Sequence, residues 1–125
     1  MARIRSVKPE FFSSLDIANL TERARLAFIG LWTYVDDDGR GPDEARLIKA
    51  ALFPLDDNVT AKAVEKVMTE LQVKGRIVRY KSPDGIALFQ VNNWLKHQRI
   101  DKARPSKYPG PFDEPSTNGH GGGHE

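Results

Sequence analysis

The spacing of apolar residues predicts a long amphipathic helix over residues 20–35. Thr21 has the residue type and the position of an N-terminal cap, because its hydroxyl oxygen can accept a hydrogen bond from a backbone N–H of the first turn. The apolar positions that follow recur every three or four residues, as on one face of a helix: Ala24, Phe28, Leu31, Trp32 and Val35. The helix ends at "DDDGRGP", residues 36–42, where acidic residues, two glycines and a proline predict a loop.

Two further helices are predicted, over about residues 43–52 and 60–73, and a short helical turn over residues 14–19 precedes all three. The helix at 43–52 is broken by the "FPLDDN" that follows it. Thr60 is placed to cap the helix at 60–73, and Gly75 is placed to end it in the left-handed conformation. The inward stripe of that helix consists of apolar residues: Ala63, Val64, Val67, Met68 and Leu71.

The stretch "GRIVRYKSPDGIALFQV", residues 75–91, predicts a β-hairpin. Its two arms are rich in apolar and β-branched residues, and "SPDG" between them has turn chemistry, since Pro83 presets one dihedral angle and Gly85 can adopt a positive φ. A hairpin of this size cannot bury enough surface to be stable alone, so it must pack against the helices.

Three helices followed by a two-stranded ribbon predict an α+β fold, the winged helix-turn-helix, with a three-helix core and a C-terminal two-stranded β-hairpin as the wing. We expect an N-terminal basic and aromatic arm at 1–12, the winged-helix domain at 13–100, and a tail at 101–125 that is first basic, then glycine-rich and disordered. The core should unite residues of the first helix, the third helix and the hairpin: Phe28, Leu31, Trp32, Val67, Leu71, Ile77 and Phe89.

The length and composition of the chain limit the classes of protein to which it can belong. The 125 residues suffice for one domain with a modest core, and 39% of them are hydrophobic. The chain has no cysteine, which excludes disulfides, thiolate nucleophiles and cysteine-ligated metal sites. No stretch of eighteen apolar residues and no signal-peptide pattern occurs, so we expect a soluble protein without membrane contact, located in the cytoplasm.

The formal net charge of +2 conceals an uneven distribution. Residues 36–73 hold five Lys or Arg against nine Asp or Glu, whereas residues 74–108 hold nine basic residues against two acidic ones. The first ten residues add three further cations. Basic charge concentrated in the hairpin, in the segment after it and in the arm is typical of a protein that binds a polyanion. An ordinary solvated surface is the alternative.

Double-stranded DNA is therefore the expected partner, with the third helix in the major groove and flanking cations on phosphates. The candidate residues of the third helix are Thr60, Lys62, Lys66 and Thr69. The candidate phosphate contacts of the arm, the wing and the C-terminal segment are Arg3, Arg5, Arg79, Lys81, Lys96, Arg99, Lys102 and Arg104.

The third helix also supports a different interpretation. It carries Glu65 and Glu70 and no arginine that could grip guanine through two hydrogen bonds. Lys62 and Lys66, one turn apart, could belong to a solvated face and pair with these glutamates or with Asp56.

The sequence does not predict an enzyme, a cofactor or a metal site. His97 has no nucleophile near it in sequence, and the serines lie in no catalytic motif. Asp36–Asp38 is interpreted as a solvated acidic loop rather than a cation site. His120 and His124 are separated by glycines, so no helix places them on one face. Core packing is favoured over base stacking for both tryptophans.

Five stretches together resemble a known family: "RIRSVKPEFF", "ARLAFIGLWTYVDDDGRG", "LIKAALFPLDD", "LQVKGRIVRY" and "NNWLKHQRIDKARPSKYPGP". In this order they are similar to small winged-helix proteins of bacteriophages and prophages, related to the N-terminal domain of phage replisome organisers and DnaD-type replication initiators. The resemblance covers about residues 3–111 and implies DNA binding and self-association in phage replication or regulation. Replisome organisers usually continue into a second helical domain, whereas this sequence ends in "DEPSTNGHGGGHE", so helicase recruitment is not expected of it alone.

Two function classes remain open. One is a DNA-binding protein in replication initiation or gene regulation; the other is a protein-protein interaction module that uses the winged helix as a scaffold for a host or phage protein. A homodimer is a further expectation, because the region ahead of the first long helix holds more apolar residues than a loose arm should expose: Ile4, Val7, Phe11, Phe12, Leu15 and Ile17. These side chains could equally fold back onto the monomer.

Overall fold

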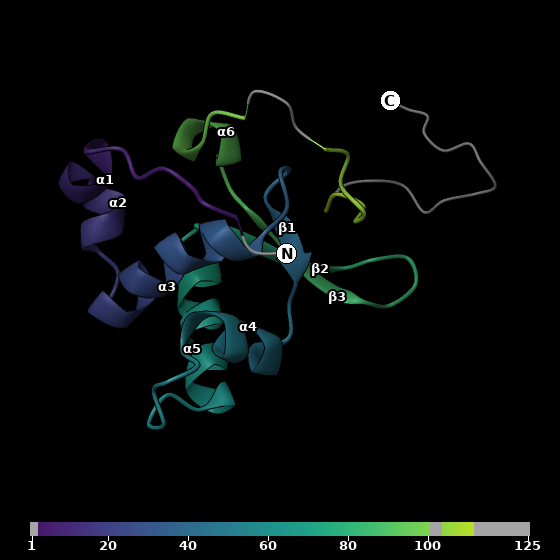
Figure 1. Cartoon of the computed structure of the whole chain (residues 1–125), viewed down its shortest axis with the longest axis horizontal. Helices are drawn as coiled ribbons and strands as arrows, with labels where there is room; N and C mark the ends of the chain where they lie inside the picture. Colours follow the sequence, from purple (N-terminus) through teal and green to yellow (C-terminus); the bar gives the residue numbers. More distant parts are fainter. Residues whose placement is uncertain (1–2, 101–103, 112–125) are drawn as a thin grey trace.

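The computed structural model describes residues 3–100 and 104–111. Within these residues the chain is an α+β fold of six helices and one three-stranded antiparallel sheet (Figure 1). The elements follow one another along the chain as α1 (Glu10–Ser13), α2 (Leu15–Ala18), α3 (Glu22–Tyr34), β1 (Arg40–Pro42), α4 (Ala45–Leu52), α5 (Ala61–Val73), β2 (Ile77–Lys81), β3 (Ala87–Val91) and α6 (Trp94–His97).

The predicted helix ends are confirmed by hydrogen bonds. The Thr21 hydroxyl accepts a hydrogen bond from the Ala24 N–H (3.2 Å), and the Thr60 hydroxyl accepts one from the Ala63 N–H (3.1 Å). Gly75 has a φ of 78°, the left-handed conformation expected after α5. Local sequence chemistry therefore determines where α3 and α5 begin and where α5 ends.

The sheet differs from the predicted two-stranded ribbon. Residues 36–42 were expected to be a loop, but Arg40–Pro42 form β1, which pairs antiparallel with β3, so that the strand order is β1-β3-β2. Three residues are too few to show the alternation of a strand in the sequence. The pairing covers an edge of β3 that would otherwise be unpaired. The resulting arrangement is compatible with a winged helix.

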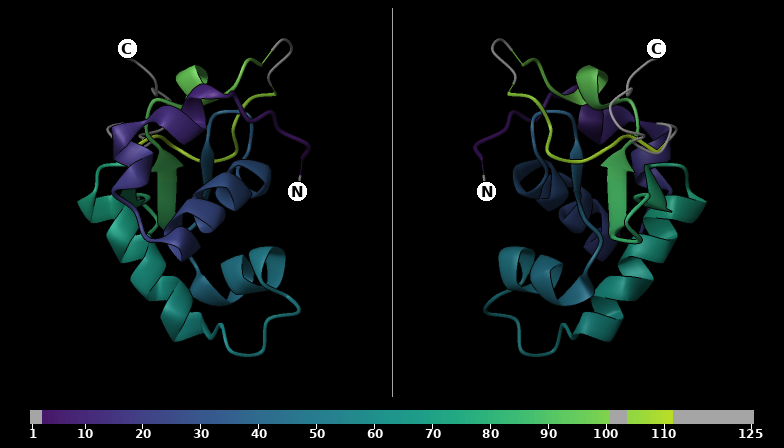
Figure 2. Two further views of the ribbon diagram at one scale, coloured as in Figure 1. Left: turned by 90° about the vertical axis from the view of Figure 1, so that its left-hand side faces the viewer. Right: turned by 90° about the vertical axis from the view of Figure 1, so that its right-hand side faces the viewer.

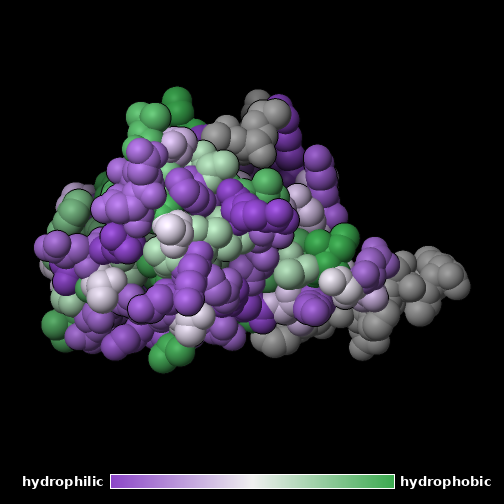
Figure 3. Space-filling view, turned by 90° about the horizontal axis from the view of Figure 1, so that it is seen from below, coloured by the Kyte–Doolittle hydropathy of each residue, from purple (hydrophilic) through white to green (hydrophobic). Residues whose placement is uncertain are grey.

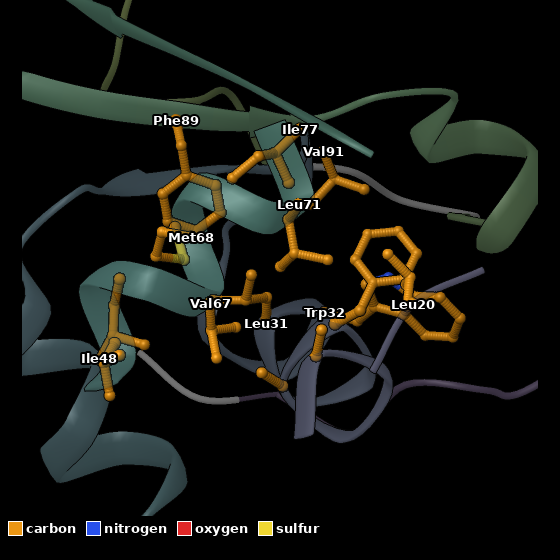
Figure 4. Close-up of a cluster of buried hydrophobic side chains, with 14 of the residues drawn as sticks. Leu20, Leu31, Trp32, Ile48, Val67, Met68, Leu71, Ile77, Phe89 and Val91 are labelled. Carbon is orange, nitrogen blue, oxygen red and sulfur yellow. The ribbon is translucent and has the colours of Figure 1, made fainter. Parts of the chain in front are cut away.

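The core lies between the helices and one face of the sheet (Figure 4). All seven residues predicted to form it are less than 7% exposed, and Phe28, Leu31 and Phe89 are fully buried. Phe89 and Ile77 of the sheet point toward Met68 and Leu71 of α5, as the close-up shows. This part of the prediction is confirmed.

The two ends of the described chain lie at the same end of the molecule. Figure 2 shows α6 and the arm that leads into α1 opposite the connection between α4 and α5. Residues 104–111, which fall in the predicted tail, contact the sheet: the Tyr80 hydroxyl donates to the Pro109 carbonyl (2.6 Å), and Arg40 Nη1 donates to the Tyr108 carbonyl (2.7 Å). We call residues 104–111 the C-terminal strap.

The N-terminal region ahead of α3 folds back onto the core only in part. Phe11 of α1 and Ile17 of α2 belong to the core cluster. Phe12 and Leu15 are 76% and 81% exposed, and Ile4 is almost fully exposed. Folding back thus explains some of the apolar residues in this region and leaves others in contact with solvent.

We predict that Trp32→Ala lowers the free energy of unfolding by about 3 to 5 kcal/mol, because the large cavity left by the indole cannot collapse completely. Trp32 packs edge-on against Phe11 and Phe28 and stacks on His97, with ring centroids 5.0 to 5.6 Å apart. Chemical denaturation measures the change. Leu26→Ala on the exposed side of the same helix is the control and should cost only a few tenths of a kcal/mol. Equal stability of the two variants would contradict the assigned core.

Candidate nucleic-acid interface

The outer face of α5 presents two lysines one turn apart. Lys62 and Lys66 are exposed, and among the described residues neither forms an ion pair or a side-chain hydrogen bond. Thr69, one turn further, is also exposed, and its hydroxyl donates to the Glu65 carbonyl (3.1 Å). The hydroxyl of Thr60 is committed to the cap of α5. Lys62, Lys66 and Thr69 therefore face solvent, and Thr60 is also exposed, although its hydroxyl is occupied by the cap.

Both glutamates of α5 are bound by other parts of the protein. Arg79 Nη2 lies 2.8 Å from each carboxylate oxygen of Glu65. Glu70 accepts hydrogen bonds from the Thr21 N–H (2.7 Å) and the Thr21 hydroxyl (2.9 Å), at the start of α3. Within the part of the chain that the structure describes, Lys62 and Lys66 therefore form no ion pair with Glu65, Glu70 or Asp56.

Arg79, a predicted phosphate contact on the wing, is held between β2, α5 and the start of α4. Its Nε donates to Asp43 Oδ2 (2.6 Å) and its Nη2 donates to Asp43 Oδ1 (3.1 Å), in addition to the bonds with Glu65. Burial alone would lower the pKa of Arg79, but its hydrogen bonds with Asp43 and Glu65 raise it overall. The side chain is only 17% exposed, so its main contacts are internal.

Lys81 supplies the exposed positive charge of the hairpin. It is the last residue of β2, two positions after Arg79 and thus on the same face of the strand. The tight turn beyond it is stabilised by the Ser82 hydroxyl, which accepts from the Ile86 N–H (3.1 Å), and by Gly85 with a φ of 83°. Seen from the α4–α5 end, hydrophilic residues cover much of the surface, and smaller groups of hydrophobic residues lie between them and at the edges (Figure 3).

Asp37 is buried, so the interpretation of residues 36–38 as a solvated acidic loop is wrong for this residue, whereas Asp38 is exposed. Asp37 is 4% exposed. Its Oδ1 lies 3.2 Å from Arg5 Nη1 and 3.5 Å from Arg3 Nη1, and its Oδ2 accepts the Arg104 backbone N–H (3.1 Å). That N–H, more than the arginine side chains, holds the pKa of Asp37 below its usual 3.8 against the effect of burial. Three predicted DNA contacts thus converge on one carboxylate.

Arg5 caps the C-terminal end of α3. Besides Asp37, its guanidinium donates to the carbonyl oxygens of Trp32 (2.8 Å), Val35 (3.1 Å) and Asp36 (3.2 Å). A cation at this end also interacts favourably with the helix dipole. Since the Arg5 side chain is only 6% exposed, the structure gives it a stabilising position rather than an exposed one.

Asp37 also anchors the segment that follows the hairpin. The indole N–H of Trp94 donates to the Asp37 carbonyl (2.8 Å), and Arg5 lies over the Trp94 ring at 5.0 Å. The side chain of Gln98 forms a reciprocal pair with the backbone of Ser6, accepting from its N–H (3.0 Å) and donating to its carbonyl (2.6 Å). Trp94 is buried, as predicted. The contribution of Gln98 was not predicted, because its partner lies 92 positions away.

The other predicted cations lie around this end of the molecule. Lys96 and Arg99 are exposed, and the Lys96 carbonyl accepts from Lys8 Nζ (2.7 Å). Lys102 lies outside the described residues, as do His120 and His124. His97 packs against the aromatic core, where burial, followed by the charges of Arg76 and Lys8, lowers its pKa, so the ring is neutral at pH 7.

No family model, curated protein or solved structure gives a significant match to the chain. The resemblance to phage replication proteins therefore stays a prediction.

Among the residues that the structure describes, no three His, Asp or Glu side chains form a group that could hold a metal ion. Over the same residues, no helix has the length and apolarity needed to cross a bilayer.

We predict that Asp37→Asn lowers the free energy of unfolding at pH 7 by about 3 to 5 kcal/mol, because Arg5 is left buried without its counter-charge. The native pKa of Asp37 lies below that of the unfolded chain, so its stabilisation is present above about pH 4 and disappears as the pH falls through the native value. Denaturation between pH 7 and pH 3 should show a weaker acid-side loss in the variant. The exposed Asp38→Asn is the control and should behave like the parent.

Proposed function

We propose that this protein is a DNA-binding winged-helix protein of phage or prophage type, acting in replication initiation or gene regulation in the host bacterial cytoplasm. In this proposal α4 and α5 form the helix-turn-helix and β2–β3 form the wing. Helix α5 enters the major groove, and the wing contacts a flanking phosphate.

The order of elements supports the proposal. One helix, a short strand, two helices and a hairpin follow one another from α3 to β3, and the strand from the loop joins the hairpin in one sheet. Arg79 ties this sheet to α5 through Glu65 and Thr69. A wing and a helix fixed to each other in this way can contact one duplex without first paying the entropy of ordering.

The observation that carries the proposal is that, within the residues that the structure describes, the acidic side chains of α5 have internal partners whereas its lysines do not. Its two carboxylates are bound by Arg79 and Thr21, whereas Lys62 and Lys66 are exposed without partners in the described part of the chain. Lysines without internal partners lose little on binding phosphate and release counterions from DNA. Lys81 extends the same kind of surface onto the wing.

The remaining cations are assigned according to their surroundings. Lys96, Arg99 and the side chain of Arg104 are exposed and would contact phosphates beside the main site. Arg3, 33% exposed in its side chain, could contribute while bound to Asp37. Arg5 and Arg79 are assigned as positioning residues, which hold the arm and the wing in place.

The exposed apolar residues of the arm and α2 favour a second candidate function, protein-protein interaction. Phe12, Leu15 and Ile4 are each more than three-quarters exposed, and Leu95 of α6 is 74% exposed. We propose a second copy of this chain as the partner, because a two-fold interface is the commonest assembly and would set two α5 helices at a fixed spacing on DNA. A replication or host protein is the alternative partner.

We predict that the protein binds random duplex DNA with an affinity that falls steeply as salt rises, and that Lys62→Gln/Lys66→Gln reduces the logarithmic salt slope by about two units. Fluorescence anisotropy at several salt concentrations measures both quantities. Lys81→Gln alone should reduce the slope by about one unit.

The control for this experiment is Arg23→Gln/Lys107→Gln, which makes the same change of net charge at exposed positions outside α5 and the wing. Its slope should equal that of the parent. If all variants lose affinity equally, binding depends on net charge alone and the assigned interface is wrong.

We predict that the chain dimerises at micromolar concentration and that Phe12→Ser/Leu15→Ser abolishes the dimer. Substitution is preferable to deletion of the arm, because deletion would also remove Arg5 and Phe11 from the folded core. Light scattering at several concentrations gives the mass. Leu55→Ser, an exposed leucine in the connection between α4 and α5, is the control. A parent that remains monomeric contradicts the prediction.

A further inference from the structure

A cavity of about 560 Å³ lies where β1, α4, the end of α3 and the C-terminal strap meet. Its volume falls within the range of small-molecule sites, about 300 to 1,000 Å³. It lies at the β1 edge of the sheet, whereas Arg79 and Lys81 belong to β2 at the opposite edge. The cavity is therefore separate from α5 and the wing, although two of its lining residues, Arg3 and Arg104, are among the flanking phosphate contacts proposed above.

One wall of the cavity is apolar and rigid. Tyr34 is stacked on Phe89, with nearly parallel rings and centroids 6.0 Å apart, and its hydroxyl donates to the Pro42 carbonyl (2.9 Å). Burial, with smaller contributions from nearby oxygens, raises the pKa of Tyr34 to about 12, so the ring stays neutral. Leu47 and Ala51 on α4 line the same space, and Leu47 is 52% exposed.

The acidic side chains of the cavity are already neutralised or hydrogen-bonded. Asp37 is paired with Arg3 and Arg5. Asp36 accepts the backbone N–H groups of Asp38 (2.9 Å) and Arg40 (3.0 Å) and the hydroxyl of Ser106. These two carboxylates leave few acceptor positions for a cationic ligand.

The cationic side chains of the cavity have fewer hydrogen bonds and ion pairs than the acidic ones. Arg40 donates only to neutral acceptors, from Nε to Gln90 Oε1 (2.9 Å) and from Nη1 to the Tyr108 carbonyl (2.7 Å), and its other N–H donors have no partner among the described residues. The side chains of Arg104 and Lys107 likewise have none within that part of the chain. With Arg3 they give four cationic side chains against two acidic ones.

We propose that this cavity binds a small organic anion that carries a carboxylate, phosphate or sulfonate group on a planar apolar body. Arg40 is fixed by its two hydrogen bonds and can offer its remaining N–H donors to an anionic oxygen, the interaction in which a guanidinium is strongest. Arg104 and Lys107 supply further positive charge at the rim. The aromatic face of Tyr34 and the side chain of Leu47 contact the apolar body.

The site also joins three segments that are distant in sequence. Arg3 belongs to the arm. Asp36, Asp37 and Arg40 belong to the connection after α3 and the start of β1, and residues 104–108 belong to the C-terminal strap. A ligand that contacts all three binds the native state and not the unfolded chain, so it raises the melting temperature. This effect does not depend on DNA binding.

The probe for the test is 8-anilinonaphthalene-1-sulfonate, an aromatic anion whose fluorescence rises in apolar surroundings. We expect it to bind the folded protein at one site and to raise the melting temperature. N-phenyl-1-naphthylamine, which has the same ring system without the sulfonate, should bind about tenfold more weakly, the loss expected for one charge-assisted hydrogen bond. Equal affinity for both compounds would overturn the anion specificity.

Two variants locate the site. Arg104→Gln/Lys107→Gln removes two rim charges while keeping every side-chain hydrogen bond found in the described residues, and should weaken the sulfonate about tenfold. Ala51→Trp should fill the cavity and abolish binding. Two further variants are controls. Lys62→Gln/Lys66→Gln makes the same change of net charge, and Phe12→Ser/Leu15→Ser makes the N-terminal region less apolar. Both should bind the sulfonate probe with the affinity of the parent. Undiminished binding by Ala51→Trp, or a loss in either control, places the probe elsewhere and refutes the proposal.

Discussion

The burial of Asp37 is the constraint on which the arrangement of both chain ends depends. A carboxylate removed from water must be compensated by charge and hydrogen bonds, and here the compensation comes from Arg5 and Arg3 in the arm and from a backbone N–H in the C-terminal strap. The carbonyl of the same residue binds the Trp94 indole. Segments that begin and end the described chain are thereby fixed around the connection after α3.

Much of the fold follows from local sequence signals. The apolar periodicities of α3 and α5, the caps Thr21 and Thr60, and the glycine after α5 each act within a few residues, so they can be read without knowledge of the tertiary structure. The core of the two helices and the hairpin followed from the same periodicities. Strand β1 did not, because it exists only through its pairing with β3, some fifty positions later.

The exposed positions of the lysines in the candidate site could be predicted from the sequence, but the internal partners of the arginines could not. A sequence gives the number of cations in a region but not their partners. Arg79, for example, binds Asp43, which lies 36 residues away in the chain. The partners differ by residue type for a physical reason. A guanidinium offers five donors in a fixed plane and suits several internal acceptors at once, whereas a lysine ammonium is strongly hydrated and favours solvent. Arg5, Arg40 and Arg79 accordingly bind other parts of the protein, and Lys62, Lys66 and Lys81 remain at the surface.

The strap is attached to Asp37 through the main-chain N–H of Arg104, so this attachment tolerates substitution of the side chain in related sequences. The bond does not depend on the side chain at position 104, so almost any amino acid there preserves the attachment. Proline is the exception, because it has no N–H to donate. The rim of the neighbouring cavity can therefore change its charge and shape by substitution at this position while the backbone anchor is inherited unchanged.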